Sequence, residues 1–112
     1  MKPTPRDEPR PAPVTRSRMR EALPALQRTT LRASQAVARR LGTSDGSPDL
    51  VAIDRDVQRW FEEVRCLGAV PRGLWLVEFP ARAGWFGWRL GDRDFTLFRL
   101  YGAPPEERAF LH

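Results

Sequence analysis

This sequence is poor in the side chains that bind metals or act as nucleophiles and bases. It contains one cysteine, Cys66, and one histidine, His112, which is the last residue. A zinc site needs three or four ligands, and a catalytic triad needs a histidine held by its neighbours, so the sequence predicts neither. A single cysteine cannot form a disulfide within the chain. We therefore expect no metal, no cofactor and no catalytic constellation, and we favour a non-enzymatic protein.

Long hydrophobic runs and a signal-peptide pattern are absent as well. No run approaches the roughly 20 apolar residues of a membrane span, and the N-terminus carries charges and prolines where a signal peptide is apolar. Residues 1–13 contain five prolines and almost no apolar side chains that could offset the entropy lost on ordering. The sequence thus predicts a cytoplasmic protein, with no membrane partner, that begins with a disordered tail over residues 1–13.

Charge, by contrast, is plentiful and unevenly distributed. Residues 1–40 carry ten basic and three acidic side chains, a balance of +7, whereas residues 41–112 carry nine and eleven, a balance of −2. Eighteen of the 19 basic residues are arginine, a skew that either a GC-rich genome or phosphate binding would produce. Association with RNA or the ribosome is therefore one hypothesis. Its candidate contacts are Arg28, Arg32, Arg39 and Arg40.

Two stretches with helical periodicity follow the tail. Thr15 is a suitable N-cap for the first, in which apolar residues recur every three or four positions as far as Leu41. Pro24 falls inside this pattern, so we expect a kink near residues 20–23 or a helix that begins there. The second stretch runs from Leu50 to Leu67, and a glycine follows it. Joined by a short polar loop, the two predict an antiparallel helical hairpin over residues 14–68.

Beyond Pro71 the apolar period changes from 3.6 to 2. Residues 74–79, 85–90 and 94–100 alternate in character and are separated by loops rich in glycine, proline or aspartate. We predict a three-stranded antiparallel meander over residues 72–101, covered on one face by the helical hairpin. Residues 102–112 would cap the sheet edge or form a helical turn from Pro105. The expected fold is a single α+β domain over residues 14–112.

The meander holds the residues that look most specific. Trp88 is expected in the core, whereas Trp75 and Trp85 could point outward, where an aromatic ring anchors a protein or stacks on a base. Glu78 and Arg89 lie on neighbouring predicted strands, so we expect them to face one another as an ion pair or a ligand-binding pair.

Several motifs in this part of the chain resemble those of a known family. Residues 72–74 read Arg-Gly-Leu, residues 77–81 read Val-Glu-Phe-Pro-Ala, and residues 87–92 read Gly-Trp-Arg-Leu-Gly-Asp. They are similar to the Arg-Gly-Leu-Val-Asp-Phe-Pro-Ala and Cys-Trp-Arg-Leu-Gly-Glu motifs of small bacterial proteins catalogued as a domain of unknown function. Val14-Thr15 and Ala22-Leu23-Pro24 on the N-terminal side, and Gly102 and Arg108 near the C-terminus, extend the resemblance over about residues 14–108.

This resemblance implies the fold and brings no activity with it. The family has Trp-His where this chain has Phe98 and Arg99, and it has cysteine where this chain has Gly87. Any role of that histidine or cysteine in relatives is therefore missing here.

Three hypotheses for function remain. The leading one is a non-enzymatic module that binds another protein or itself. Its candidate interaction surface consists of Trp75, Glu78, Trp85, Arg89 and Arg99. The alternatives are the RNA or ribosome association described above, and a small-ligand binder or enzyme that uses Glu78 and Arg89.

Overall fold

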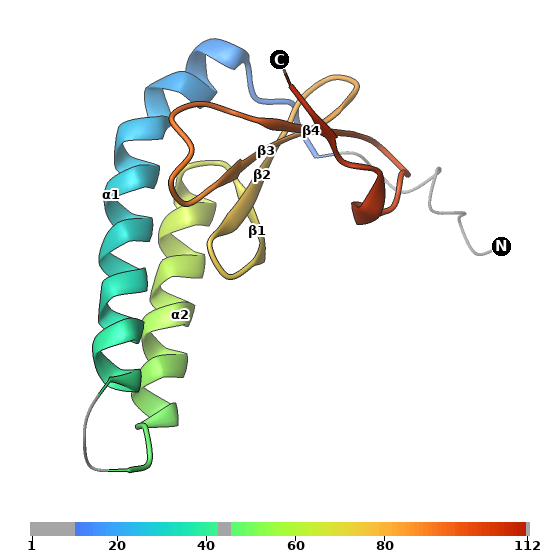
Figure 1. The fold of residues 1–112 in the computed structure, drawn as a ribbon. Coiled ribbons are helices and arrows are strands. Elements are labelled where there is room, and N and C mark those ends of the chain that lie inside the picture. Colours follow the sequence, from blue (N-terminus) through green and yellow to red (C-terminus); the bar gives the residue numbers. More distant parts are fainter. Residues whose placement is uncertain (1–10, 43–45, 112) are drawn as a thin grey trace, which may run out of the picture.

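A computed structural model describes residues 11–42 and 46–111 of the chain, so most of the predicted tail and His112 lie outside the described residues. These residues form two helices and one antiparallel sheet, which confirms the α+β class (Figure 1). The elements, in order, are α1 (Arg16–Leu41), α2 (Leu50–Cys66), β1 (Val70–Gly73), β2 (Leu76–Pro80), β3 (Gly84–Arg89), β4 (Leu97–Leu100), the 3₁₀ turn η1 (Pro105–Glu107) and β5 (Ala109–Phe110).

The first helix begins where its cap predicts. The Thr15 hydroxyl accepts a hydrogen bond from the backbone N–H of Arg18 at 3.2 Å, and α1 then continues without a break through Pro24 to Leu41. The alternative prediction, a helix that begins near residues 20–23, is therefore wrong. Pro24 is exposed, so water can bind the Arg20 carbonyl that lacks its helical N–H partner. The first turns of α1 lean toward the sheet (Figure 1).

The second helix runs antiparallel to the first and packs along it. Its N-cap is Asp49, whose carboxylate accepts from the Ala52 N–H at 3.1 Å. Between the helices, the buried indole N–H of Trp60 donates to the Thr30 hydroxyl at 2.8 Å. No described helix is long and apolar enough to cross a membrane. The expected helical hairpin is confirmed.

The sheet has five strands rather than the three that the sequence predicted. Its order is β1-β2-β3-β4-β5, and each neighbouring pair is antiparallel. The predicted meander corresponds to β2, β3 and β4. The strand β1 was missed because its four residues include a proline and a glycine, and β5 because it has only two residues.

The C-terminal segment forms both of the structures that its sequence allowed, a helical turn and a cap on the sheet edge. It makes the turn η1 from Pro105 and then adds β5 to the edge of β4. A backbone hydrogen bond from Leu111 N–H to the Thr96 carbonyl, 2.8 Å long, follows β5.

One face of the sheet forms the core together with the helices. Val77, Phe79 and Trp88 are each 0% exposed and cluster with Met19 and Trp60 of the helical hairpin. The helices stand beside β1 and β2, and their lower halves extend past the sheet, whereas β4 and the C-terminal segment lie farther away (Figure 1). The helical layer therefore covers one end of the sheet better than the other.

Candidate functional site

The most buried charge in the described residues is Glu78, in the middle of β2. Its neighbours Val77 and Phe79 are in the core, so strand alternation turns Glu78 to the face away from the helices. It is nevertheless only 1% exposed. The residue opposite it on β3 is Gly87, which contributes no side chain to that space.

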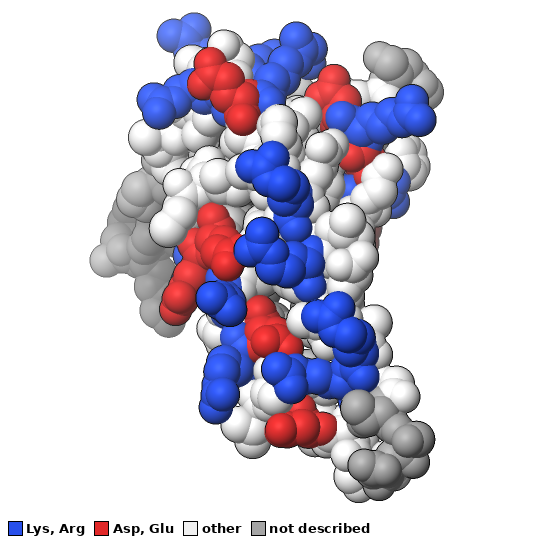
Figure 2. Space-filling view, turned by 90° about the vertical axis from the view of Figure 1, so that its left-hand side faces the viewer, with Lys and Arg blue, Asp and Glu red and all other residues white. Residues whose placement is uncertain are grey.

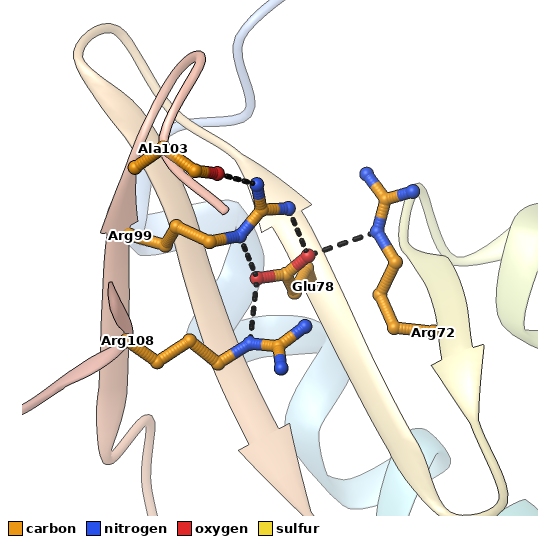
Figure 3. A network of polar contacts seen from close by, with 5 residues as sticks. All are labelled: Arg72, Glu78, Arg99, Ala103 and Arg108. Carbon is orange, nitrogen blue, oxygen red and sulfur yellow. Dashed lines mark hydrogen bonds and ion pairs between the residues drawn. The ribbon is translucent and has the colours of Figure 1, made fainter. Parts of the chain in front are cut away.

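Three arginines surround this carboxylate (Figure 3). Arg99 binds both of its oxygens, Nη2 to Oε1 at 2.7 Å and Nε to Oε2 at 3.1 Å. Arg72 Nε donates to Oε1 at 2.8 Å and Arg108 Nε to Oε2 at 3.2 Å. Arg99 also donates through Nη1 to the Ala103 carbonyl at 2.8 Å. The cluster thus ties β2 to β1, to β4 and to the C-terminal segment.

The protonation of Glu78 follows from these contacts. Burial alone raises the pKa of a carboxyl group, but the hydrogen bonds and positive charges of Arg99 and Arg108 outweigh it, so the pKa of Glu78 lies below its ordinary value. The carboxylate is therefore ionised at neutral pH with both oxygens engaged. A group held in this way is a weak base and a hindered nucleophile, and its arrangement suits a structural ion cluster.

Arg89 is not the partner of Glu78, and that expectation from the sequence is wrong. The β2–β3 register places Leu76 opposite Arg89 and offsets Glu78 from it by two residues. Arg89 instead lies 3.6 Å from the Asp92 carboxylate and stacks on the Phe110 ring at 5.6 Å. A ligand-binding pair made of Glu78 and Arg89 does not exist in this structure.

Trp85 points away from the helices but is covered. It is 9% exposed, because the guanidinium of Arg72 lies 4.6 Å from its ring centre and the Tyr101 ring meets it edge-on at 5.5 Å. The guanidinium of Arg99 lies 5.9 Å from the same ring. The indole is thus part of the packing around Glu78 and not a free anchor.

Trp75 is also packed, in this case against a helix. It sits in the β1–β2 turn with a φ of 67°, a left-handed conformation that is uncommon for a side chain of this size. Its ring meets Trp60 of α2 edge-on, with centroids 5.0 Å apart. Trp75 is half-buried, so neither tryptophan of the expected interaction surface projects freely into solvent.

Two half-buried aromatic side chains lie at the other end of the sheet. Phe86 of β3 and Phe98 of β4 are cross-strand partners on the helix side, with ring centroids 5.1 Å apart, and both are half-buried. They border two hollows of about 440 and 660 Å³, which also share Arg16 at the start of α1. The Arg16 guanidinium lies 5.3 Å from the Phe86 ring. This region is called the Phe86–Phe98 hollow below.

The four arginines proposed for nucleic-acid contact differ in their exposure and in their ion pairing. Arg28, Arg32 and Arg39 are exposed on α1, whereas Arg40 is half-buried and its Nε lies 2.6 Å from the Asp56 carboxylate of α2. Figure 2 looks onto the α1 side and shows basic side chains following one another down this face, with acidic ones beside them.

The cluster around Glu78 could be located only in part from the sequence. Glu78 and Arg99 were expected at an interaction surface, but Arg72 and Arg108 were not. The sequence did indicate that Arg72 and Arg108 were unusual, because both lie at motif positions of the family resemblance. Nothing local indicated that these four residues would converge.

Within residues 11–42 and 46–111, no group of three or more histidine, cysteine, aspartate or glutamate side chains could hold a metal ion. Comparison of the chain with protein-family models, with curated proteins and with solved structures finds no match. The family resemblance therefore stays a prediction from its motifs.

Proposed function

We propose that this chain is a non-enzymatic protein-interaction module whose docking site is the Phe86–Phe98 hollow. The observation that carries this proposal is the pair of half-buried phenylalanines beside two hollows of about 440 and 660 Å³. Apolar side chains of a partner would be withdrawn from water there. The engagement of Glu78 by three arginines favours binding over catalysis, because it leaves that carboxylate poorly suited to proton transfer.

The partner is a segment that combines apolar and acidic side chains. Arg16, Arg20 and Arg82 border the hollow, and Asp94 is the one carboxylate among the described residues that line it. Opposite charge at the rim of an interface speeds association and selects among partners. Residues 1–10 of the chain itself carry three basic and two acidic side chains, so they match this rim less well.

A pair of synthetic peptides tests the proposal. Both are amphipathic and share the same apolar residues, but one carries glutamates on its polar face and the other carries lysines. We expect the acidic peptide to bind more tightly in fluorescence anisotropy and to shift the amide resonances of Phe86 and Phe98 in NMR spectra.

Two charge reversals in the first turn of α1 form a matched pair. Arg16→Glu places a negative charge at the hollow, and we expect it to weaken binding of the acidic peptide about tenfold. This is roughly the loss of affinity expected when two exposed charge contacts are removed. Arg18→Glu makes the same change at a residue that does not line the hollow, so it should leave affinity nearly unchanged. Glutamate near a helix N-terminus favours the helix, so both variants should fold.

Three outcomes would count against the proposal. They are equal binding of the two peptides, an equal loss of affinity in the two variants, and a large gain in affinity when residues 1–10 are deleted. The last outcome would mean that the chain's own N-terminal segment occupies the hollow.

A further inference from the structure

A second surface lies on α1, away from the hollow. Arg28, Arg32 and Arg39 are all exposed. At about 100° and 1.5 Å per residue, these three positions fall within about 40° of one another and span about 16 Å along the helix. They form one row on the solvent side of the helix, called the arginine row below.

The positive charge of the arginine row is not neutralised by ion pairs with described residues. None of its three members makes an ion pair with another described residue. The two carboxylates of α2 that line a pocket together with Arg32 have other arginine partners, since Asp56 lies 2.6 Å from Arg40 and Glu63 lies 3.7 Å from Arg59. The one carboxylate of α1 is Glu21, about two turns before the row.

We propose that the arginine row binds the phosphate backbone of a nucleic-acid duplex. The phosphates of one strand are spaced about 3.4 Å apart along the axis of the duplex, so a row of about 16 Å that lies parallel to this axis spans about five of them. Guanidinium groups suit phosphate oxygens because they offer paired N–H donors. The row has no ion pair with a described residue that it would lose on binding.

The rest of the helix favours a duplex over unpaired strands. Binding of single strands relies on aromatic side chains that stack on exposed bases, and α1 contains no aromatic residue. A row of three guanidinium groups touches phosphates only, so it binds with little dependence on base sequence. DNA and RNA duplexes share the phosphate backbone, and the experiment therefore includes both.

The test measures how the affinity of the full chain for fluorescent duplexes changes with salt. Three phosphate contacts predict that the logarithm of the association constant falls with the logarithm of salt concentration at a slope of about −2.7. Each single Arg→Gln variant of the row should reduce that slope by about 0.9, and the triple variant should lose most of the binding. The duplex that binds more tightly, DNA or RNA, identifies the source of the phosphates.

A second triple variant controls for net charge. Arg55→Gln, Arg65→Gln and Arg93→Gln together remove the same charge from exposed residues outside α1, and we expect this variant to keep the slope. The proposal is overturned by equal losses in the two triple variants, by absence of duplex binding at low salt, or by tighter binding of single strands. Circular dichroism of each variant shows that the helices are intact. These outcomes do not depend on the peptide experiments at the hollow.

Discussion

At the scale of single residues, two adjacent threonines of α1 are in opposite situations. Thr30 is fully buried, and its hydroxyl accepts the indole N–H of Trp60. The Thr29 hydroxyl is also buried but has no hydrogen-bond partner among the residues that the structure describes. Because valine has nearly the shape of threonine, the same substitution at each position separates the value of the hydrogen bond from that of packing.

We expect Thr30→Val to lower the free energy of unfolding by about 1–3 kcal/mol, because the Trp60 N–H would stay buried without an acceptor. Thr29→Val removes a buried unpaired hydroxyl, so it should be neutral or stabilising by up to about 1 kcal/mol. Urea unfolding followed by tryptophan fluorescence measures both. Equal destabilisation by the two substitutions would contradict the account of this contact.

At the scale of helices and strands, the sequence predicted those elements that depend on residues close together in the chain. The helices follow from apolar periodicity and, for α1, from the cap Thr15, which acts within one turn. The strands β2, β3 and β4 follow from alternation between turn residues. The short strands β1 and β5 have no comparable signal, since they are strands only because a neighbouring strand offers hydrogen-bond partners.

The site was less predictable because its contacts join distant parts of the chain. The sequence marked Glu78 as unusual, a charge between apolar residues of a strand, but it did not give the register of the β2–β3 ladder. A two-residue offset was enough to replace Arg89 with Gly87 as the residue opposite Glu78. Its actual partners include Arg99 and Arg108, which are 21 and 30 residues away in sequence.

Since Glu78 joins several elements, its removal should be costly. We expect Glu78→Gln to lower the free energy of unfolding by about 3–5 kcal/mol, because it leaves two largely buried guanidinium groups without their counter-charge. The matched variant is Arg72→Gln, whose side chain is 34% exposed, and it should cost about 1 kcal/mol or less. Urea unfolding again gives both values. Similar losses in the two variants would argue against a structural ion cluster centred on Glu78.

At the scale of the whole molecule, the helical layer and the sheet do not fully overlap. The helices cover β1 and β2, which leaves the Phe86–Phe98 hollow open at the other end of the sheet, near the start of α1. The arginine row lies farther along the same helix, on its solvent side. The two proposed binding surfaces are therefore separate and can be altered independently, whereas the Glu78 cluster stabilises the sheet that supports the hollow.

That cluster also makes the stability of the whole molecule depend on pH. The pKa of Glu78 is lowered in the folded chain, whereas in the unfolded chain it is about 4.3. Above about pH 4.3 both states are ionised, so the contribution of Glu78 to stability is fully present. As the pH falls further, the unfolded chain binds the proton first, and stability decreases until the folded-state pKa has been passed.

We therefore expect the free energy of unfolding to fall more steeply with acidification in the natural chain than in Glu78→Gln, which has no carboxyl group to titrate at this position. Glu62→Gln removes an exposed carboxylate of α2 that makes no ion pair with a described residue, so it should retain the steep dependence. Urea unfolding at a series of pH values from neutral to acid gives the three curves. If Glu78→Gln kept the acid sensitivity of the natural chain, other carboxylates would have to cause it, and the ionised state assigned to Glu78 would be wrong.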